Sequence, residues 1–275
     1  MFALALAGAP AAFADSSESS NWAGYAIHRT GVHFSKVVGE WTQTSATCTP
    51  GEPTYSSIWV GLGGYSTSSQ ALEQIGTELD CNRSGQTVSS VWYELVPAPS
   101  RTVKLTVRPG DRVRASVAVS GHEVQLTLQD LTRHKSFTKA VHVSVLDTSS
   151  ADWIVEAPAQ CFDQNACQTL PLADFGSATF SLASAESTTG QTGTITDRRW
   201  GVSRITLAEA GRRFIDGSRA TTALASATPS VLSENGSSFT VTYSGLSSTT
   251  PPASGTPVSA ARAGELFRPG RAAGS

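Results

Sequence analysis

The sequence predicts an all-β protein whose antiparallel strands form a sandwich or a barrel. Short runs rich in Val, Ile, Thr and aromatic residues alternate with Gly, Pro, Ser and Asp along most of the 275 residues. Strands that follow one another without intervening helices pair antiparallel. The clearest strand segments are "SSIWVGLGG", "VSSVWYELVP", "TVKLTVRPGDRVRASVAVSG", "EVQLTLQDLT", "KAVHVSV", "DWIVEAP", "ATFSLASAES" and "SSFTVTYSG". One segment, "SRITLAEAGRRF", fits either a short helix or a strand followed by a loop.

A single domain over residues 15–245 is expected, because 39% hydrophobic content supports one large core. Residues 1–14 are predicted to be a signal peptide, with the small-residue cleavage site Ala12-Phe13-Ala14 before Asp15. A basic n-region is missing, so the start of this peptide is expected to be truncated or misassigned. Residues 246–275 are rich in Ser, Thr, Pro, Gly and Ala, which predicts a disordered, low-complexity tail.

Charge and hydropathy limit the partners. The net charge of -2 offers no electrostatic attraction to nucleic acid or to an anionic membrane. No apolar run after the signal peptide is long enough to cross a bilayer. The mature protein is therefore expected to be soluble, secreted and monomeric.

The four cysteines agree with an oxidising compartment. Cys48, Cys81, Cys161 and Cys167 are even in number and lack the CxxC spacing of a metal site. Four cysteines allow three pairings, and the sequence alone does not choose among them. We favour Cys161–Cys167, which would close a short loop, together with Cys48–Cys81 in the N-terminal half.

Common catalytic motifs are missing from the sequence. There is no HExxH, G-x-S-x-G, P-loop or GxGxxG pattern. The five histidines have no zinc-binding spacing and are expected to be structural: His28, His33, His122, His134 and His142. No metal and no cofactor are therefore expected.

The segment "VLDTSS" resembles the active-site turn of pepsin-like aspartic peptidases, with Asp147 in the place of the catalytic carboxylate. That chemistry needs two carboxylates that share a proton. A second Asp-Thr-Gly or Asp-Thr-Ser is missing, since "FIDGS" at 214–218 lacks the Thr. We therefore interpret Asp147 as part of a loop that joins strands.

The segment "ADWIVEAP" alternates like a strand but ends on a carboxylate. Trp153 and Val155 would share one face, while Asp152, Ile154 and Glu156 share the other. A strand that is apolar on both faces is normally covered on both sides, where a Glu needs a partner. Partial desolvation would raise the pKa of Glu156, which suits a general base or acid.

Five segments, in order, resemble the glutamic peptidases, the eqolisin family. "NWAGY" at 21–25 matches the family's opening, and "SSIWVGLGG" matches its Ala-Trp-Val-Gly-Ile-Asp-Gly segment. "LEQIGTE" matches a Leu-Gln-Thr-Gly segment, "VWYELVP" matches Ala-Trp-Tyr-Glu-Trp-Tyr-Pro, and "ADWIVEAP" matches the strand that carries the family's Glu. The order holds from about residue 19 to residue 243, which is most of the mature chain.

This resemblance implies a fold and a mechanism. The fold is an antiparallel two-sheet β-sandwich of the concanavalin A-like or jelly-roll type, with the active site on its concave face. The catalytic residues fall on Gln74 and Glu156. In the family the Glu is the general base on a water, and the Gln amide holds that water and stabilises the oxyanion. A secreted acid endopeptidase that needs no cofactor, resists pepstatin and acts on proteins or peptides is implied.

The resemblance also suggests substrate-binding residues. Trp59, Glu78, Trp92, Tyr93 and Glu94 match or lie beside positions that line the family's cleft. The aromatic residues among them could equally belong to the core of a sandwich. Because strand side chains alternate, Trp92 and Glu94 should point one way and Tyr93 the other, so not all three can face a substrate.

One residue departs from the pattern. Gly63 stands where the family has an Asp, so an acidic cleft residue is expected to be lost. The nearly balanced charge also resembles bacterial more than fungal members, whose working pH is strongly acidic. The alternatives left open are a lectin-like carbohydrate-binding module and an inactive homologue, because a sandwich fold does not fix function. The Gln74–Glu156 pair separates them, since a sugar-binding module does not need it.

Overall fold

The computed structural model describes residues 15–161, 167–208 and 225–245, and these residues form eighteen β-strands. The predicted signal peptide, the predicted tail and "FIDGS" lie outside the described residues. The strands are β1 (Asp15–Ser19), β2 (Trp22–His28), β3 (Phe34–Thr42), β4 (Ser57–Gly63), β5 (Leu72–Cys81), β6 (Thr87–Val96), β7 (Arg101–Val103), β8 (Arg112–Ser120), β9 (Glu123–Asp130), β10 (Lys135–His142), β11 (Ser150–Glu156), β12 (Ala159–Cys161), β13 (Cys167–Thr169), β14 (Ser177–Ser187), β15 (Thr192–Thr194), β16 (Gly201–Ala208), β17 (Ala225–Pro229) and β18 (Phe239–Gly245).

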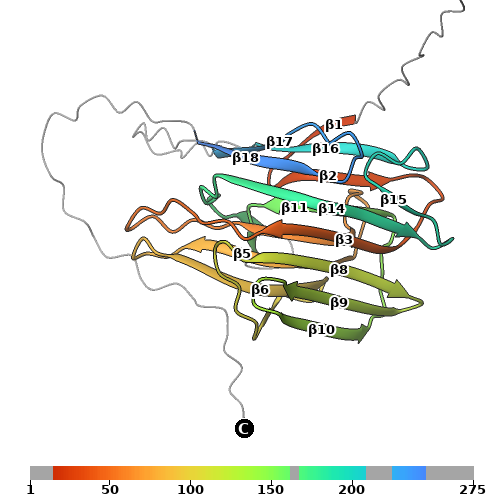
Figure 1. Ribbon diagram of the computed structural model, residues 1–275, viewed down its shortest axis with the longest axis horizontal. Coiled ribbons are helices and arrows are strands. Elements are labelled where there is room, and N and C mark those ends of the chain that lie inside the picture. Colours follow the sequence, from red (N-terminus) through yellow and green to blue (C-terminus); the bar gives the residue numbers. More distant parts are fainter. Residues whose placement is uncertain (1–14, 162–166, 209–224, 246–275) are drawn as a thin grey trace, which may run out of the picture.

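Sixteen of the described strands form one hydrogen-bonded sheet. Its order is β10-β9-β8-β3-β14-β18-β17-β16-β2-β11-β4-β5-β6-β7, while β15 pairs with β14 and β1 pairs in parallel with β16. The path folds over, so that the layer from β10 to β18 packs against the layer from β16 to β7 (Figure 1). The predicted two-layer antiparallel sandwich is confirmed. The structure adds that β17 and β18 join the two layers by hydrogen bonds.

The core lies between the two layers and follows from strand alternation. In β4, Ile58, Val60 and Leu62 point into this core. In β11, Trp153 does the same, and its indole Nε1 donates to the carbonyl oxygen of Val38 at 2.7 Å. The faces expected for "ADWIVEAP" are therefore those observed.

A second, smaller apolar cluster lies on the opposite face of the β16-to-β7 layer. We call this side the outer face, because it points away from the core shared by the two layers. The cluster consists of Ala26, Trp59, Leu72, Trp92, Ile154 and Ile205, with Trp22, Tyr65 and Val96 packed against it. The strands in the middle of this layer are apolar on both faces, as predicted for a strand covered on both sides.

The segment left open between helix and strand is a strand in its described part, β16. Its remaining residues lie outside the described residues. Among the residues that the structure describes, no helix is long and apolar enough to cross a membrane.

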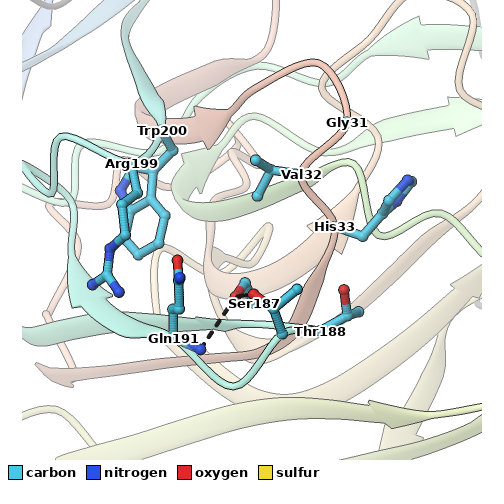
Figure 2. A pocket seen from close by; sticks show the side chains of 9 residues that line it. Gly31, Val32, His33, Ser187, Thr188, Gln191, Arg199 and Trp200 are labelled. Carbon is cyan, nitrogen blue, oxygen red and sulfur yellow. Dashed lines mark hydrogen bonds between the residues drawn. The ribbon is translucent and has the colours of Figure 1, made fainter.

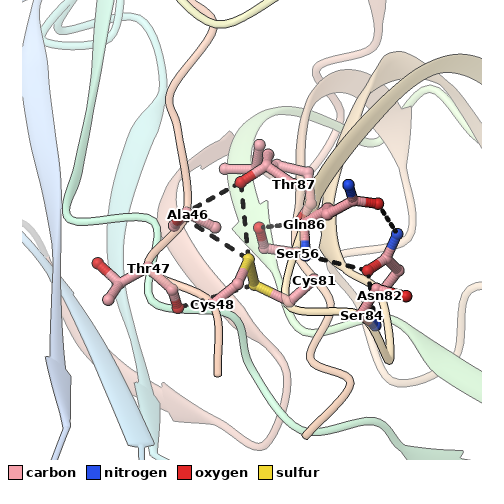
Figure 3. The surroundings of a disulfide bond; sticks show 10 residues. Ala46, Thr47, Cys48, Ser56, Cys81, Asn82, Ser84, Gln86 and Thr87 are labelled. Carbon is pink, nitrogen blue, oxygen red and sulfur yellow. Dashed lines mark hydrogen bonds between the residues drawn. A yellow bond between two sulfur atoms is a disulfide. The ribbon is translucent and has the colours of Figure 1, made fainter. Parts of the chain in front are cut away.

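The predicted disulfide Cys48–Cys81 is present, with the two Cα atoms 5.4 Å apart. It ties the loop after β3 to the end of β5 (Figure 3). Cys161 and Cys167 face each other in register across β12 and β13. Their side chains lie outside what the structure describes, so the bond between them stays a prediction.

Replacing Cys48 and Cys81 together by Ser should destabilise the fold by about 3–4 kcal/mol, the chain-entropy value for a loop of this length. The bridge spans 33 positions of the sequence. Urea denaturation of the variant and the wild type measures the difference. The Cys161→Ser/Cys167→Ser variant is the matched control, with a smaller expected loss because its loop is much shorter. An unchanged denaturation midpoint for the first variant would contradict the prediction.

Candidate active site

Strand register places the predicted catalytic residues on the outer face, two rows apart. Across β2, β11, β4, β5 and β6 three rows of aligned residues face outwards. The first row is Ala26, Asp152, Gly61, Gln74 and Glu94; the second is Gly24, Ile154, Trp59, Gly76 and Trp92; the third is Trp22, Glu156, Ser57, Glu78 and Ser90. Trp59 therefore lies in the row between that of Gln74 and that of Glu156.

Glu156 is partly buried at the end of β11, where two neutral donors hold its carboxylate. The Nδ2 of Asn21 donates to Oε1 at 3.0 Å, and the indole Nε1 of Trp59 donates to Oε2 at 2.8 Å. Asn21 is itself oriented by Ser19, whose hydroxyl donates to its Oδ1 at 3.1 Å. Glu156 forms no ion pair with a cationic side chain among the described residues.

Burial raises the pKa of Glu156 from its usual 4.5 to about 7. The donor groups of Trp59, Trp22 and Asn21 act in the opposite direction and stabilise the ionised form. The negative charge of Glu94 raises the pKa further. A carboxylate with a raised pKa and neutral donors is a stronger base than one paired with a cation.

Gln74 lies on β5, almost fully buried at 4% exposure. Its Nε2 donates to Oε2 of Glu94 at 2.7 Å. That bond uses one of the two N–H groups of the amide and leaves the other available. Oε1 is buried without a hydrogen-bond partner among the described groups. Burial raises the pKa of Glu94, while the donors Gln74 and the Ser100 backbone lower it. The neighbouring Glu73 points to the other face of β5, so alternation supports Gln74 over Glu73.

Glycines make room for the Trp59 ring in this sheet. A Cβ on Gly76 would lie 2.6 Å from the Cβ of Trp59, and a Cβ on Gly61 would lie 3.0 Å from its ring. The ring also packs edge-on against Trp22, with centroids 5.0 Å apart. Trp59 is fully buried, and its indole Nε1 donates to Glu156. The sequence motifs contained Asn21 and Trp59 but did not indicate this role for them.

The remaining substrate-binding candidates divide between the two faces. Trp92 and Glu94 point outwards, and the indole Nε1 of Trp92 is buried without a partner among the described groups. Glu78 also faces outwards and accepts a hydrogen bond from the Ser90 hydroxyl. Tyr93 faces the core side and stacks on Phe137. The expected alternation holds, because Tyr93 lies on the face opposite Trp92 and Glu94.

The cavity shown in Figure 2 lies apart from these residues, beside the β14–β15 turn. His33, Gln191, Arg199 and Trp200 are among its lining residues. Its volume is about 80 Å³, while ligand pockets typically begin at roughly 300 Å³. Within the described residues, no group of three or more His, Cys, Asp or Glu side chains is arranged to hold a metal ion.

Comparisons with known proteins concern the family and the fold of the whole chain. The model of the Peptidase A4 family matches residues 20–211. The structure resembles scytalido-glutamic peptidase, solved with a peptide-based transition state analog, at 22% identity and a TM-score of 0.62 over 82% of this chain and 98% of that one. It also resembles SCP-B, a member of the eqolisin family in a complex with the tripeptide Ala-Ile-His, at 21% identity and a TM-score of 0.57 over 82% and 98%.

A further similar structure is aspergilloglutamic peptidase from Aspergillus niger. It shares 28% identity over 70% of this chain and 99% of that one, with a TM-score of 0.51. No curated protein sequence matches the chain significantly.

The chain belongs to the Peptidase A4 family, whose model covers well over half of it. It is a glutamic-type endopeptidase with the eqolisin β-sandwich fold.

Proposed function

We propose that Glu156 and Gln74 are the catalytic dyad of a secreted endopeptidase that hydrolyses peptide bonds with an activated water. The observation that carries this proposal is that the side-chain amide of Gln74, on the same outer face as Glu156, has hydrogen-bonding groups without a partner among the described residues. Gln74 keeps a free N–H and an unpartnered, buried Oε1 beside Glu94. The charge of Glu94 acts in turn on Glu156, which supports the assignment of the three side chains to one site.

In the proposed reaction Glu156 removes a proton from a water while the water oxygen attacks the peptide carbonyl carbon. Gln74 donates its free N–H to the oxygen that becomes negatively charged, and its Oε1 accepts from the attacking water. The C–N bond of the tetrahedral intermediate then breaks, and protonated Glu156 returns its proton to the leaving nitrogen. One water is consumed, and one carboxyl group and one amine are formed.

The neighbouring side chains prepare this dyad. Glu94 fixes the Gln74 amide with its nitrogen towards the carboxylate, because only Nε2 can donate there. Asn21 and Trp59 hold both oxygens of Glu156 in place. Trp92 offers its unpartnered indole N–H to a carbonyl of a bound peptide. Apart from Asn21, which lies between β1 and β2, these groups are built on strands, which hold a site more firmly than loops do.

Secretion is part of the proposal. The Cys48–Cys81 disulfide supports an oxidising compartment. The predicted cleavage site lies directly before Asp15. When the full chain is produced in a secreting host, the protein recovered from the medium should have Asp15 as its N-terminal residue.

The experiment that tests the function is casein hydrolysis by this secreted protein from pH 2 to 8. EDTA and pepstatin are included to inhibit metal-dependent and aspartic peptidases. Activity that resists both inhibitors supports the proposal. A folded wild type without activity at any pH would contradict it, and binding to a panel of glycans would then be measured.

Glu94→Gln should shift the acid-side limb of the kcat/KM profile to lower pH. The general base must be ionised, so activity rises with pH through the pKa of Glu156, which is about 7. The negative charge of Glu94 raises that pKa, so its removal lowers it. A Gln at this position still offers an oxygen to the Gln74 amide. The profile is measured with a short peptide between pH 3 and 9.

Glu123→Gln serves as the matched control for this shift. Glu123 is an exposed carboxylate at the start of β9, in the other layer, and pairs with His142. Its removal changes the net charge by the same amount but should leave the limb where it is. A limb that does not move in Glu94→Gln, or that moves equally in both variants, would contradict the coupling of Glu94 to Glu156.

A further inference from the structure

Gly63, where the resemblance predicts the loss of an acidic residue, lies against another carboxylate. It is the last residue of β4 and has a φ of +79°. A Cβ placed on Gly63 would lie 2.6 Å from the Cβ and 2.9 Å from the Cγ of Asp147. The first atoms of a side chain at position 63 and those of Asp147 would therefore compete for the same space. The acid expected at position 63 is missing from β4, but a carboxylate group reaches this place from another segment.

Asp147 lies between β10 and β11 and holds the segment between β4 and β5. Its Oδ2 accepts from the Gly64 backbone N–H at 3.3 Å and from the Ser69 hydroxyl. Its Oδ1 accepts from the Ser149 backbone N–H at 2.8 Å. The Ser69 and Ser149 donors keep the pKa of Asp147 below its usual value despite burial. The carboxylate is therefore ionised and bound to donors from two segments.

The backbone of Asp147 extends the same connection. Its N–H and its side-chain charge both act on the carboxyl group of Glu73, which is 1% exposed and lies next to Gln74 in β5. Asp147 therefore binds Ser69 just before β5 and acts electrostatically on Glu73 at the start of β5. Asp147 itself lies three residues before the start of β11, the strand that ends on Glu156.

We propose that Asp147 is a positioning residue of the peptidase, which joins the start of the Gln74 strand to the start of the Glu156 strand in the place left free by Gly63. This inference rests on the proposed dyad and adds a residue that holds its two strands in register. Asp147 itself does not touch the reacting atoms. Because a displacement of about 1 Å at a reacting group can lower the rate about 100-fold, loss of this connection should appear in kcat.

The test exchanges the two residues. Asp147→Gly removes the carboxylate, and Gly63→Asp adds one where Asp147 already fills the space. Each single variant should lower kcat by roughly 10- to 100-fold, while KM changes by less than about threefold. The double variant Gly63→Asp/Asp147→Gly returns one carboxylate to the same space, and Asp tolerates positive φ better than most residues. It should therefore recover most of the kcat lost in Asp147→Gly.

Asp130→Gly is the matched control. Asp130 is a buried carboxylate in the other layer that also accepts two backbone N–H bonds, from Thr132 and Arg133. Its loss should lower the melting temperature without lowering kcat at a temperature where the variant is folded. This control separates a general loss of stability from a loss of positioning.

Three results would overturn the inference. The first is a double variant whose kcat is as low as the product of the two single effects, because the carboxylates would then not share one role. The second is a kcat in Asp147→Gly equal to that of Asp130→Gly. In both cases, loss of activity in Gln74→Ala and Glu156→Gln would show that the dyad itself stands. The third is an inactive wild type, which overturns the dyad and its positioning residue together.

Discussion

Glu156→Gln should lower kcat about 1,000-fold or more while KM changes little. The amide has nearly the shape of the carboxylate and still offers an oxygen to the Trp59 indole, which donates to Oε2 at 2.8 Å in the wild type. It cannot accept a proton from water at any working pH, and general base catalysis typically contributes 10²- to 10⁴-fold. The measurement is kcat and KM with a fluorogenic peptide at the pH optimum of the wild type.

The same variant makes a prediction about stability that separates chemistry from misfolding. The pKa of Glu156 is raised to about 7, so the folded state binds the proton more tightly than the unfolded state does. The stability from this group is fully present below the unfolded pKa of 4.5 and is lost as the pH rises through about 7. Gln does not titrate. The melting temperature of Glu156→Gln relative to the wild type should therefore increase between pH 4.5 and 8.

Two outcomes would count against Glu156 as the base. One is a variant that keeps more than a tenth of the wild-type kcat with an unchanged pH profile. The other is a loss of activity accompanied by a large fall in melting temperature at all pH values, since inactivity would then follow from unfolding. Asn21→Ala should lower kcat less than Glu156→Gln does, because Trp59 still donates to Glu156.

Much of the fold could be predicted from periodicity alone. The alternation in "ADWIVEAP" placed Trp153 and Glu156 on opposite faces of one strand, and the structure confirms this. The alternation of "VWYEL" likewise separated Tyr93 from its two neighbours. A period of two is a local property, so these assignments need no knowledge of the partner strands. The union of the two layers through β17 depends on long-range pairing and could not be predicted.

The candidate site was predicted less completely, for the same physical reason. Family motifs pointed to Gln74 and Glu156, but the donors that act on Glu156 depend on pairing between segments far apart in the chain. Asn21 is 135 positions away from it and Trp59 is 97. A burial pattern cannot show such contacts. The sequence offered Trp59 as a substrate-binding candidate or a core aromatic, and the structure adds that it is a buried donor to Glu156.

Gly63 illustrates the limit most directly. Reading positions one at a time predicts that an acid is lost there. The structure instead brings the Asp147 side chain within 2.6 Å of where a Cβ on Gly63 would lie, from a loop 84 positions away by the numbering. The loop assignment of Asp147 was correct, but the pattern "LDTSS" gave no sign of which strand its carboxylate would contact. The closeness of Asp147 to position 63 can be seen only in the folded structure.

Gln74→Ala should lower kcat by roughly 100- to 1,000-fold, the usual cost of removing one oxyanion donor. The amide offers one free N–H to the developing negative charge, and Ala offers none. The side chain is 4% exposed and bonds only to Glu94 among the described groups, so the fold should survive its loss. Steady-state kinetics measure the change. Gln191→Ala, at the distant β14–β15 turn, is the matched control and should retain wild-type kcat.

The double variant Gln74→Ala/Glu156→Gln decides whether the two residues act in one step. If Gln74 stabilises the oxyanion that forms only when Glu156 activates the water, removing both should cost little more than removing Glu156 alone. Residues that act as a unit are strongly non-additive in this way. Independent roles, such as substrate binding by Gln74, would instead multiply the two losses and raise KM. That result would contradict a shared catalytic step, because a group that only binds substrate does not depend on the base.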